Sequence, residues 1–264
     1  MTQIVGIAMV RNDDIFLERS ITNVVNFCDK IIILEGFSSD QTWSIVQKLA
    51  NQYDHITAHQ IHSYLDSHAF ISDYADSDTW IFGIDGDEVY DPTGLIDFKK
   101  DLLAGTYDND WLLLGNVLHC NYWDQQEGIA RGYNGKSMTK LYNFNAIYAW
   151  PGRFERFHNT KSISFKQGYH FKMRRKLYFE YDWDNSPFRC LHLCFMPRSS
   201  DLSLSATRPG PGDSPLILRG LDRLTSIAKI VGRLIHQRHS DYKAKYYKRE
   251  ELIEVDTTSF TQPT

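Results

Sequence analysis

Three carboxylates around a single glycine follow a short apolar run and could together hold a divalent metal ion. They are Asp85, Asp87 and Glu88, directly after residues 80–84, which read Trp-Ile-Phe-Gly-Ile. Crowded carboxylates repel one another unless a cation neutralises them, and such oxygen ligands suit Mg²⁺ or Mn²⁺, which also bind phosphate oxygens. Gly86 lets the backbone turn tightly, so that Asp85 and Asp87 can face one site. The alternative is a solvated acidic turn that caps the next helix, because Asp-x-Asp alone is a weak pattern.

A second group of metal-ligating residue types occurs late in the chain. Cys190, His192 and Cys194 alternate with period two, which would place them on one face of a strand. A zinc site is one interpretation, although the spacing is not that of paired Cys-x-x-Cys elements. The other interpretation is a hydrogen-bonded histidine in an ordinary core.

The elements that must position the acidic triplet alternate between strand and helix. Apolar runs of strand length recur four times, at residues 4–10, 31–34, 55–61 and 79–84. Between them, apolar residues at helical spacing predict three helices. Asp13 or Asp14 would cap the first helix and Asp40 the second, and the third would cover residues 66–75. This order predicts a mainly parallel, doubly wound sheet, in which ligands collect beyond the carboxyl ends of the strands. The triplet follows the fourth predicted strand, and this position favours a metal site over a solvated acidic turn.

Three segments, in order, carry a resemblance to a known family. Residues 9–14 place Arg-Asn and two acidic residues after the first strand, residues 34–42 end the second strand in Glu35 and a Ser-Asp-Gln-Thr turn, and residues 80–88 form the tryptophan-led strand and acidic triplet. Together they resemble the family-2 glycosyltransferases of GT-A fold, particularly the short bacterial and viral members. The resemblance covers roughly residues 4–92. It implies metal-dependent transfer of a sugar from a nucleotide diphosphate sugar to an acceptor hydroxyl.

The same resemblance implies roles for individual residues. Nucleotide-sugar binding would fall to Val10, Arg11, Glu35, Asp85 and Gly86, and metal binding to Asp87, Asp85 and His192. The family more often has aspartate at the position of Glu35. For Arg11 and Glu35 the alternative is a salt bridge within the loops. The implied cofactor is Mn²⁺ or Mg²⁺, and the implied donor is a UDP- or GDP-type sugar.

A catalytic base is needed if the transfer inverts the anomeric carbon by single displacement. Residues 140–143 and 148–155 resemble a segment that runs to a Gly-x-x-His-Glu element in related enzymes, but this chain lacks the histidine. Glu155 is the candidate base, and its alternative role is an ion pair with a neighbouring arginine. The other carboxylates that could serve are Asp124, Asp182 and Asp184.

We expect the chain to divide into three parts. Residues 1–119 would bind the nucleotide sugar, residues 120–215 would form a mixed α+β acceptor half with a mobile loop at 197–215, and residues 216–264 would be a basic amphipathic helix and tail. The predicted fold is α/β: a Rossmann-like, mainly parallel sheet with helices on both faces. We also expect a helix over 93–103, a strand over 111–119 and frayed ends in the last dozen residues.

Charge and cysteine content limit the partners. The net charge is −4, while residues 219–249 hold nine Lys/Arg against two acidic residues, so the remainder carries −4 − 7 = −11. This argues against nucleic acid as a partner. The basic segment 219–249 would be a packing helix, or would contact an anionic membrane surface or a phosphate-bearing acceptor. Four cysteines and no apolar run of membrane-spanning length predict a cytoplasmic protein. The resemblance to glycosyltransferases implies a glycan, lipid-linked or protein acceptor.

Two rival functions remain. A nucleotidyltransferase should carry a Gly-rich phosphate loop near its N-terminus, where this chain has Arg-Asn-Asp-Asp at residues 11–14. A non-catalytic nucleotide-sugar or glycan-binding module of the same fold would bind the donor without turnover. The missing histidine before Glu155 keeps that second rival open.

Overall fold

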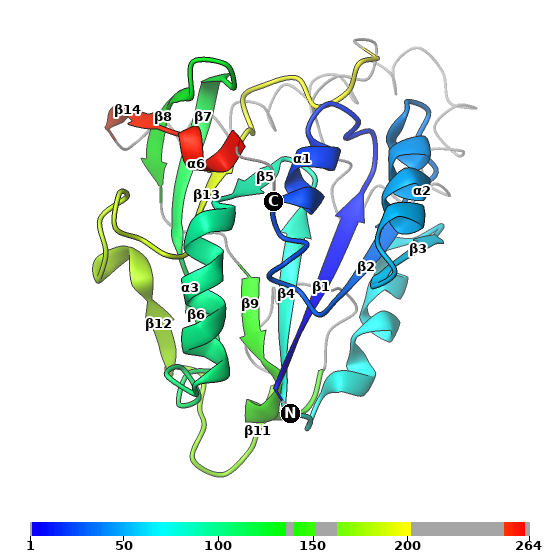
Figure 1. The fold of residues 1–264 in the computed structure, drawn as a ribbon. Helices are drawn as coiled ribbons and strands as arrows, with labels where there is room; N and C mark the ends of the chain where they lie inside the picture. Colours follow the sequence, from blue (N-terminus) through cyan, green and yellow to red (C-terminus); the bar gives the residue numbers. More distant parts are fainter. Residues whose placement is uncertain (1, 136–139, 151–162, 202–250, 262–264) are drawn as a thin grey trace, which may run out of the picture.

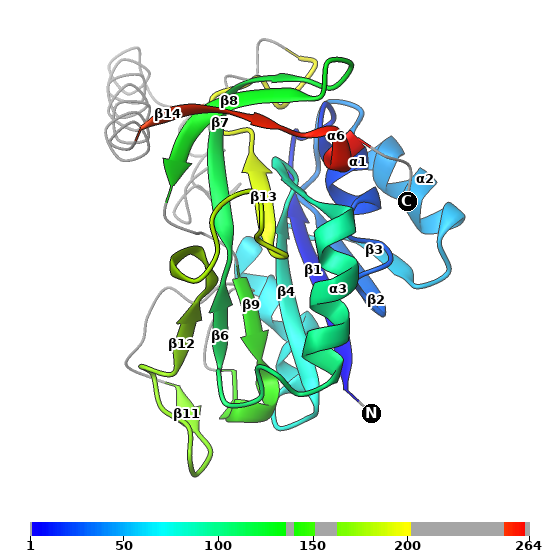
Figure 2. The ribbon, with the colours of Figure 1, turned by 60° about the vertical axis from the view of Figure 1, so that its left-hand side comes forward.

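The computed structural model describes residues 2–135, 140–150, 163–201 and 251–261. It is a mixed α/β structure built on a seven-stranded sheet, a five-stranded sheet and a separate pair of short strands, as Figures 1 and 2 show. Glu155, most of the predicted loop at 197–215 and the predicted basic segment 219–249 lie outside the described residues. No helix among the described residues is long and apolar enough to cross a membrane.

The larger sheet has the strand order β12-β6-β9-β4-β1-β2-β3 and is mostly parallel. Its strands are β1 (Gln3–Val10), β2 (Lys30–Glu35), β3 (Ile56–Gln60), β4 (Thr79–Asp85), β6 (Leu112–Leu114), β9 (Lys140–Asn143) and β12 (Arg174–Lys176). Strands β3, β2, β1 and β4 run parallel, and only β9 is antiparallel to its neighbours. The predicted parallel sheet of the first four strands is therefore confirmed.

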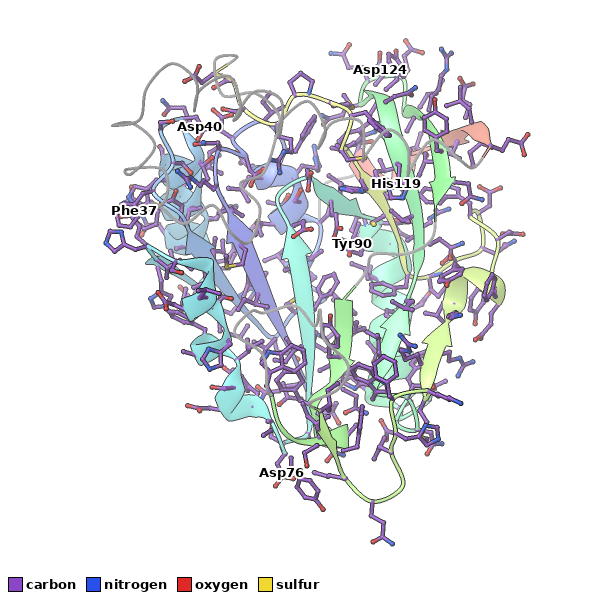
Figure 3. All side chains as sticks on the ribbon, turned by 180° about the vertical axis from the view of Figure 1, so that it is seen from behind. Phe37, Asp40, Asp76, Tyr90, His119 and Asp124 are labelled. Carbon is purple, nitrogen blue, oxygen red and sulfur yellow. The ribbon has the colours of Figure 1, made fainter. Side chains whose placement is uncertain are left out.

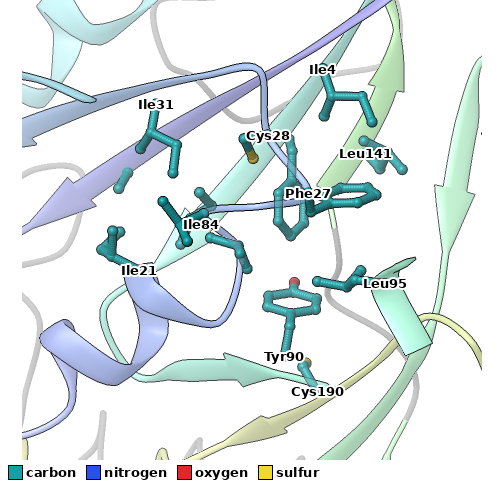
Figure 4. Close-up of a cluster of buried hydrophobic side chains, with 14 of the residues drawn as sticks. Ile4, Ile21, Phe27, Cys28, Ile31, Ile84, Tyr90, Leu95, Leu141 and Cys190 are labelled. Atoms are coloured by element: carbon teal, nitrogen blue, oxygen red, sulfur yellow. The ribbon is translucent and has the colours of Figure 1, made fainter. Parts of the chain in front are cut away.

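Alternate residues of β1 face two different cores. Ile4, Ala8 and Val10 pack with the helices α1 (Leu17–Thr22), α2 (Thr42–Gln52) and α3 (Pro92–Leu103), all on one face. Figure 4 shows that this core also takes in Tyr90, Leu95 and Cys190, so it continues into the second sheet.

The opposite face is covered differently from the prediction. Its core contains Val5, Ile7 and Met9 of β1, packed with residues of short 3-10 turns and of the β10 (Ile147–Ala149) and β11 (Ser164–Phe165) pair. The segment predicted as a helix over 66–75 forms the 3-10 turns η1 (Tyr64–Phe70) and η2 (Ser72–Tyr74). Its Ser and Asp side chains compete for backbone hydrogen bonds, and it lacks an apolar stripe that would support an α-helix. In the described residues, α-helices therefore cover one face of the large sheet, not both.

The smaller sheet has the order β14-β8-β7-β13-β5. Its strands are β5 (Glu88–Tyr90), β7 (Asn116–Asp124), β8 (Ile129–Gly135), β13 (Arg189–His192) and β14 (Leu252–Asp256). The predicted strand over 111–119 is two strands, because the chain leaves the large sheet at Leu114 and enters the small one at Asn116. Gly115 makes the change possible, since a Cβ there would lie 2.0 Å from the Phe188 carbonyl oxygen.

Residues 251–261 pack against the rest of the chain, contrary to the expectation of frayed ends, while 262–264 lie outside the described residues. Strand β14 pairs antiparallel with β8, and a short helix α6 (Thr258–Thr261) follows it. Phe260 is fully buried, and its carbonyl accepts a hydrogen bond from Asn23 at 2.8 Å. Figure 2 shows this segment crossing the small sheet to reach the helices. Burial of the Phe260 ring therefore holds α6 in place, which the composition of this segment did not predict.

Candidate functional site

The carboxyl ends of β2, β1 and β4 meet at one edge of the large sheet, as the sequence predicts. Val10 stands opposite Glu35 in the register of β1 and β2, and Met9 stands opposite Asp85 in the register of β1 and β4. Figure 3 shows Asp40 at this end of the molecule and Asp76 at the far end. The ligand-binding edge of an open parallel sheet thus collects the polar residues that follow these strands.

Four buried carboxylates gather beyond β1 and β4. Asp13, Asp85, Asp87 and Glu88 are each at most 2% exposed. Asp13 was predicted to cap a helix, but α1 begins later, at Leu17, and no side chain caps it. The Asp13 carboxylate instead accepts a hydrogen bond from the Arg11 amide and lies against Gly86. Burial of four acids in one place requires positive charge nearby.

Arg198 supplies part of that charge. Its Nη1 lies 3.0 Å from Asp13 Oδ1 and 3.5 Å from Asp87 Oδ2, and the side chain is 6% exposed. Its carbonyl accepts a hydrogen bond from the Ile15 amide at 3.0 Å. Its guanidinium thus places one positive charge among carboxylates that are buried close together.

The next two residues fasten this segment to the loops beyond β1 and β2. Ser199 donates a 2.6 Å hydrogen bond to Asp40, and the Ser200 amide and hydroxyl both donate to Asp14. The start of the predicted mobile loop is therefore tied down as far as Asp201, beyond which the chain is not described. These ties hold the Arg198 side chain inside the cluster.

Gly86 is required by packing as well as by the turn. A Cβ at this position would lie 2.8 Å from Asp13 Cβ, and the Gly86 carbonyl accepts a hydrogen bond from Ser20 at 3.0 Å. We expect Gly86→Ala to lower the free energy of unfolding by about 1–3 kcal/mol, because the extra methyl must displace Asp13. Denaturant unfolding of the wild type and the variant would measure this difference, to which strain from a positive φ does not contribute, since Gly86 is not among the glycines with positive φ. A Gly86→Ala chain as stable as the wild type would contradict the close approach.

Polar side chains gather at the end of β2, close to the acidic cluster. Glu35 is fully buried and accepts hydrogen bonds from the Ser38 amide and, at 2.8 Å, from the Gln60 side chain. Within the part of the chain that the structure describes, no ion pair joins Arg11 to Glu35. Phe37, two residues on, is 46% exposed and stacks on His62 with ring centroids 4.3 Å apart. A flat aromatic surface therefore accompanies the buried carboxylate.

Two histidines join the cluster from the small sheet. His192 Nε2 lies 3.8 Å from Asp87 Oδ2, and its Nδ1 lies 2.9 Å from the Nδ1 of His119. Burial, together with the neighbouring His192, lowers the pKa of His119 to about 3, so this imidazole is neutral at physiological pH. Cys194 completes a buried group of two imidazoles and a thiol.

The other predicted residues are placed as follows. Cys190 lies in the core beside Tyr90, so the zinc interpretation of Cys190, His192 and Cys194 is wrong in its first member, where His119 takes its place. Asp124 accepts hydrogen bonds from the amides of Gln126 and Glu127 at an exposed turn, which lowers its pKa. Asp182 and Asp184 are exposed, and the carbonyl of Asp184 accepts from Arg189.

Sequence reasoning missed Arg198 and His119 and misassigned Asp13. Asp13 was visible as one of two acids after Arg-Asn, and either acid was predicted to cap a helix. Arg198 gave no local sign, because it approaches Asp87 from 111 residues away. His119 could be found only through the pairing of β7 with β13, which sets it opposite His192.

Comparisons with known proteins give only distant likenesses. No family model and no curated protein matches the chain. Among solved structures, S. aureus TarS 1–349 in complex with UDP has 15% identity and a TM-score of 0.36, over 56% of this chain and 50% of that one. HddC from Yersinia pseudotuberculosis has 14% identity and a TM-score of 0.37, over 67% of this chain and 89% of that one. This chain thus matches only half the length of TarS, and functional conclusions depend on the residues of the site.

Proposed function

We propose that this chain is a metal-dependent glycosyltransferase of GT-A type, which transfers a sugar from a UDP- or GDP-type donor to an acceptor hydroxyl with inversion. The observation that carries the proposal is the cluster of four buried carboxylates at the carboxyl ends of β1 and β4, with Arg198 as its partial counterion. Carboxylates buried close together repel one another, and oxygen ligands of this kind suit a divalent cation. A divalent cation bound by the carboxylates would offset their repulsion and would also bind the diphosphate of the donor.

The donor set fits Mn²⁺ or Mg²⁺, which prefer carboxylate oxygens and accept phosphate oxygens as further ligands. Asp87 and Asp85 would hold the ion, which when bound would offset the charge that develops on the leaving diphosphate. His192 was predicted to complete this ligand set, but its ring has two neighbours. Its Nε2 faces Asp87, whereas its Nδ1 faces His119.

The chain's own residues would bind and orient the donor. Glu35 is buried and fixed by Ser38 and Gln60, and each carboxylate oxygen keeps a lone pair for the base or ribose. Phe37 offers an exposed ring against which a nucleobase could stack. Arg198 would move from Asp13 and Asp87 toward the diphosphate as the leaving group gains charge. Val10 and Arg11 would flank the nucleotide.

Glu155 stays our proposed base, and it lies outside the described residues. A base would take the proton of the acceptor hydroxyl as the oxygen attacks the anomeric carbon. The acceptor would be a glycan, a lipid-linked sugar or a protein hydroxyl.

Metal-dependent donor binding tests the proposal. We expect UDP- or GDP-sugars to raise the melting temperature only with Mn²⁺ or Mg²⁺ present. At a donor concentration of about 100 times Kd, the native state gains about 2.7 kcal/mol, or roughly 5–10 °C for a chain of this size. Equal shifts with a chelator would contradict a metal bridge, and no shift with any sugar nucleotide would contradict donor binding itself.

The rival is a non-catalytic binding module of the same fold, favoured by the absent histidine before Glu155. Both functions predict the thermal shift, so turnover must separate them. We expect slow metal-dependent hydrolysis of the bound donor by the transferase, followed by release of the nucleoside diphosphate. A donor that binds and stays intact would favour the module.

A further inference from the structure

His119, His192 and Cys194 form a second group of metal-ligating side chains, next to the carboxylates but different in chemistry. One ligand atom from each lies within 4.8 Å of the other two, and all three residues are buried. Two imidazoles and a thiol are the ligands of Zn²⁺-type ions, whereas Mg²⁺ and Mn²⁺ prefer oxygen. The group is therefore a poor match to the ion expected at the carboxylates and a good match to a softer one.

The backbone brings these ligands together before any ion binds. His119 on β7 and His192 on β13 are direct partners in a parallel register, so their rings project from the same face of adjacent strands. Gly135 of β8 leaves room for the His119 ring, since a Cβ there would lie 2.2 Å from its Nε2. Cys194 follows directly after β13, where the Leu193 amide donates to the Asp87 carbonyl at 2.8 Å. Ligands held in this way lose little conformational freedom on binding.

Asp87 stands where the carboxylate behind a metal-binding histidine usually stands. The two Nδ1 atoms of His119 and His192 face each other at 2.9 Å, and His192 Nε2 faces Asp87 Oδ2 at 3.8 Å. When a histidine binds an ion through one nitrogen, the N–H of the other commonly points at a carboxylate, which fixes the ring and its tautomer. A small approach of Asp87 would complete that arrangement.

We propose that His119, His192 and Cys194 bind a Zn²⁺-class divalent ion, with His192 acting through Nδ1 and Cys194 as the thiolate. Three protein ligands leave a fourth position for water. The ion would fix the chain at Cys194, four residues before Arg198, and would thereby hold the segment that places Arg198 among the carboxylates. The proposal of this site does not rest on sugar transfer, and it replaces the assignment of His192 to the ion at Asp87.

Co²⁺ absorption on the metal-free, full-length chain tests the proposal directly. We expect a near-ultraviolet band from thiolate-to-Co²⁺ charge transfer that saturates at a single ion per chain and disappears when Zn²⁺ is added. Cys194→Ser should lose this band. Cys190→Ser is the matched control, because Cys190 is equally buried nearby but packs beside Tyr90, and this variant should keep the band.

The possible outcomes separate this proposal from the proposed function. A wild-type chain without the band would overturn the site and requires no variant to fold. A band that survives Cys194→Ser, or that is lost in Cys190→Ser, would overturn it as well. His119→Gln should weaken Co²⁺ binding at least about tenfold, as loss of one ligand does. Asp85→Asn should abolish metal-dependent donor binding while it keeps the Co²⁺ band, so that each proposal can fail alone.

Discussion

Asp87→Ala is expected to lower sugar transfer by at least about a thousandfold, because it removes the carboxylate that we assign to the ion at the leaving diphosphate. Its stability should change by less than about 1 kcal/mol. Arg198 keeps its closer partner Asp13 at 3.0 Å, and the Asp87 carbonyl still accepts from Leu193 in an alanine variant. Removal of one buried acid also relieves repulsion among the remaining three.

Turnover of a sugar nucleotide, measured together with denaturant unfolding, would check both halves of this expectation. Asp97→Ala is the control for loss of a carboxylate, because Asp97 is exposed and pairs with Lys100 on α3. It should leave transfer unchanged. An active Asp87→Ala enzyme would show that the acidic triplet is a turn and not a metal site, whereas an unfolded one would show that the cluster is structural.

The sequence was sufficient for the half of the site that depends on strand ends. Asp85 follows an apolar run, and parallel strands bring such ends to one edge whatever the rest of the chain does. The register confirms that Val10, Glu35 and Asp85 end neighbouring strands. The apolar runs in the sequence therefore predict where these three residues lie in the sheet, while the roles of the residues in binding stay predictions.

The other half depends on contacts between distant segments, which local pattern does not encode. Asp13 looked like a helix cap because an acid before an apolar stripe usually is one, but pairing with Arg198 across 185 residues took precedence. His119 lay in a predicted strand with nothing to single it out until β7 paired with β13. Gly115 likewise interrupts a continuous apolar run only because the Phe188 carbonyl passes close by. Tertiary contacts decided each of these cases.

Two arginines that each pair with a buried carboxylate allow a matched comparison, for which we expect a second large effect. Arg198 lies between Asp13 and Asp87, while Arg189 pairs with Asp91 at 2.7 Å near the start of α3. With a chelator present, Arg198→Met and Arg189→Met should each lower the free energy of unfolding by about 3–5 kcal/mol, because each leaves a buried carboxylate without its cation.

Mn²⁺ should separate the two variants. In Arg198→Met, an ion held by Asp85 and Asp87 would restore positive charge to the acidic cluster, and no guanidinium would repel it. Mn²⁺ should therefore bind this variant more tightly than the wild type and recover most of the lost free energy of unfolding. In Arg189→Met, Mn²⁺ should stabilise the chain no more than it stabilises the wild type, because Asp91 is a single carboxylate that caps α3 through Thr93. Denaturant unfolding with and without Mn²⁺ measures both differences. Equal responses of the two variants would mean that Arg198 is an ordinary structural counterion and that the carboxylates do not share an ion.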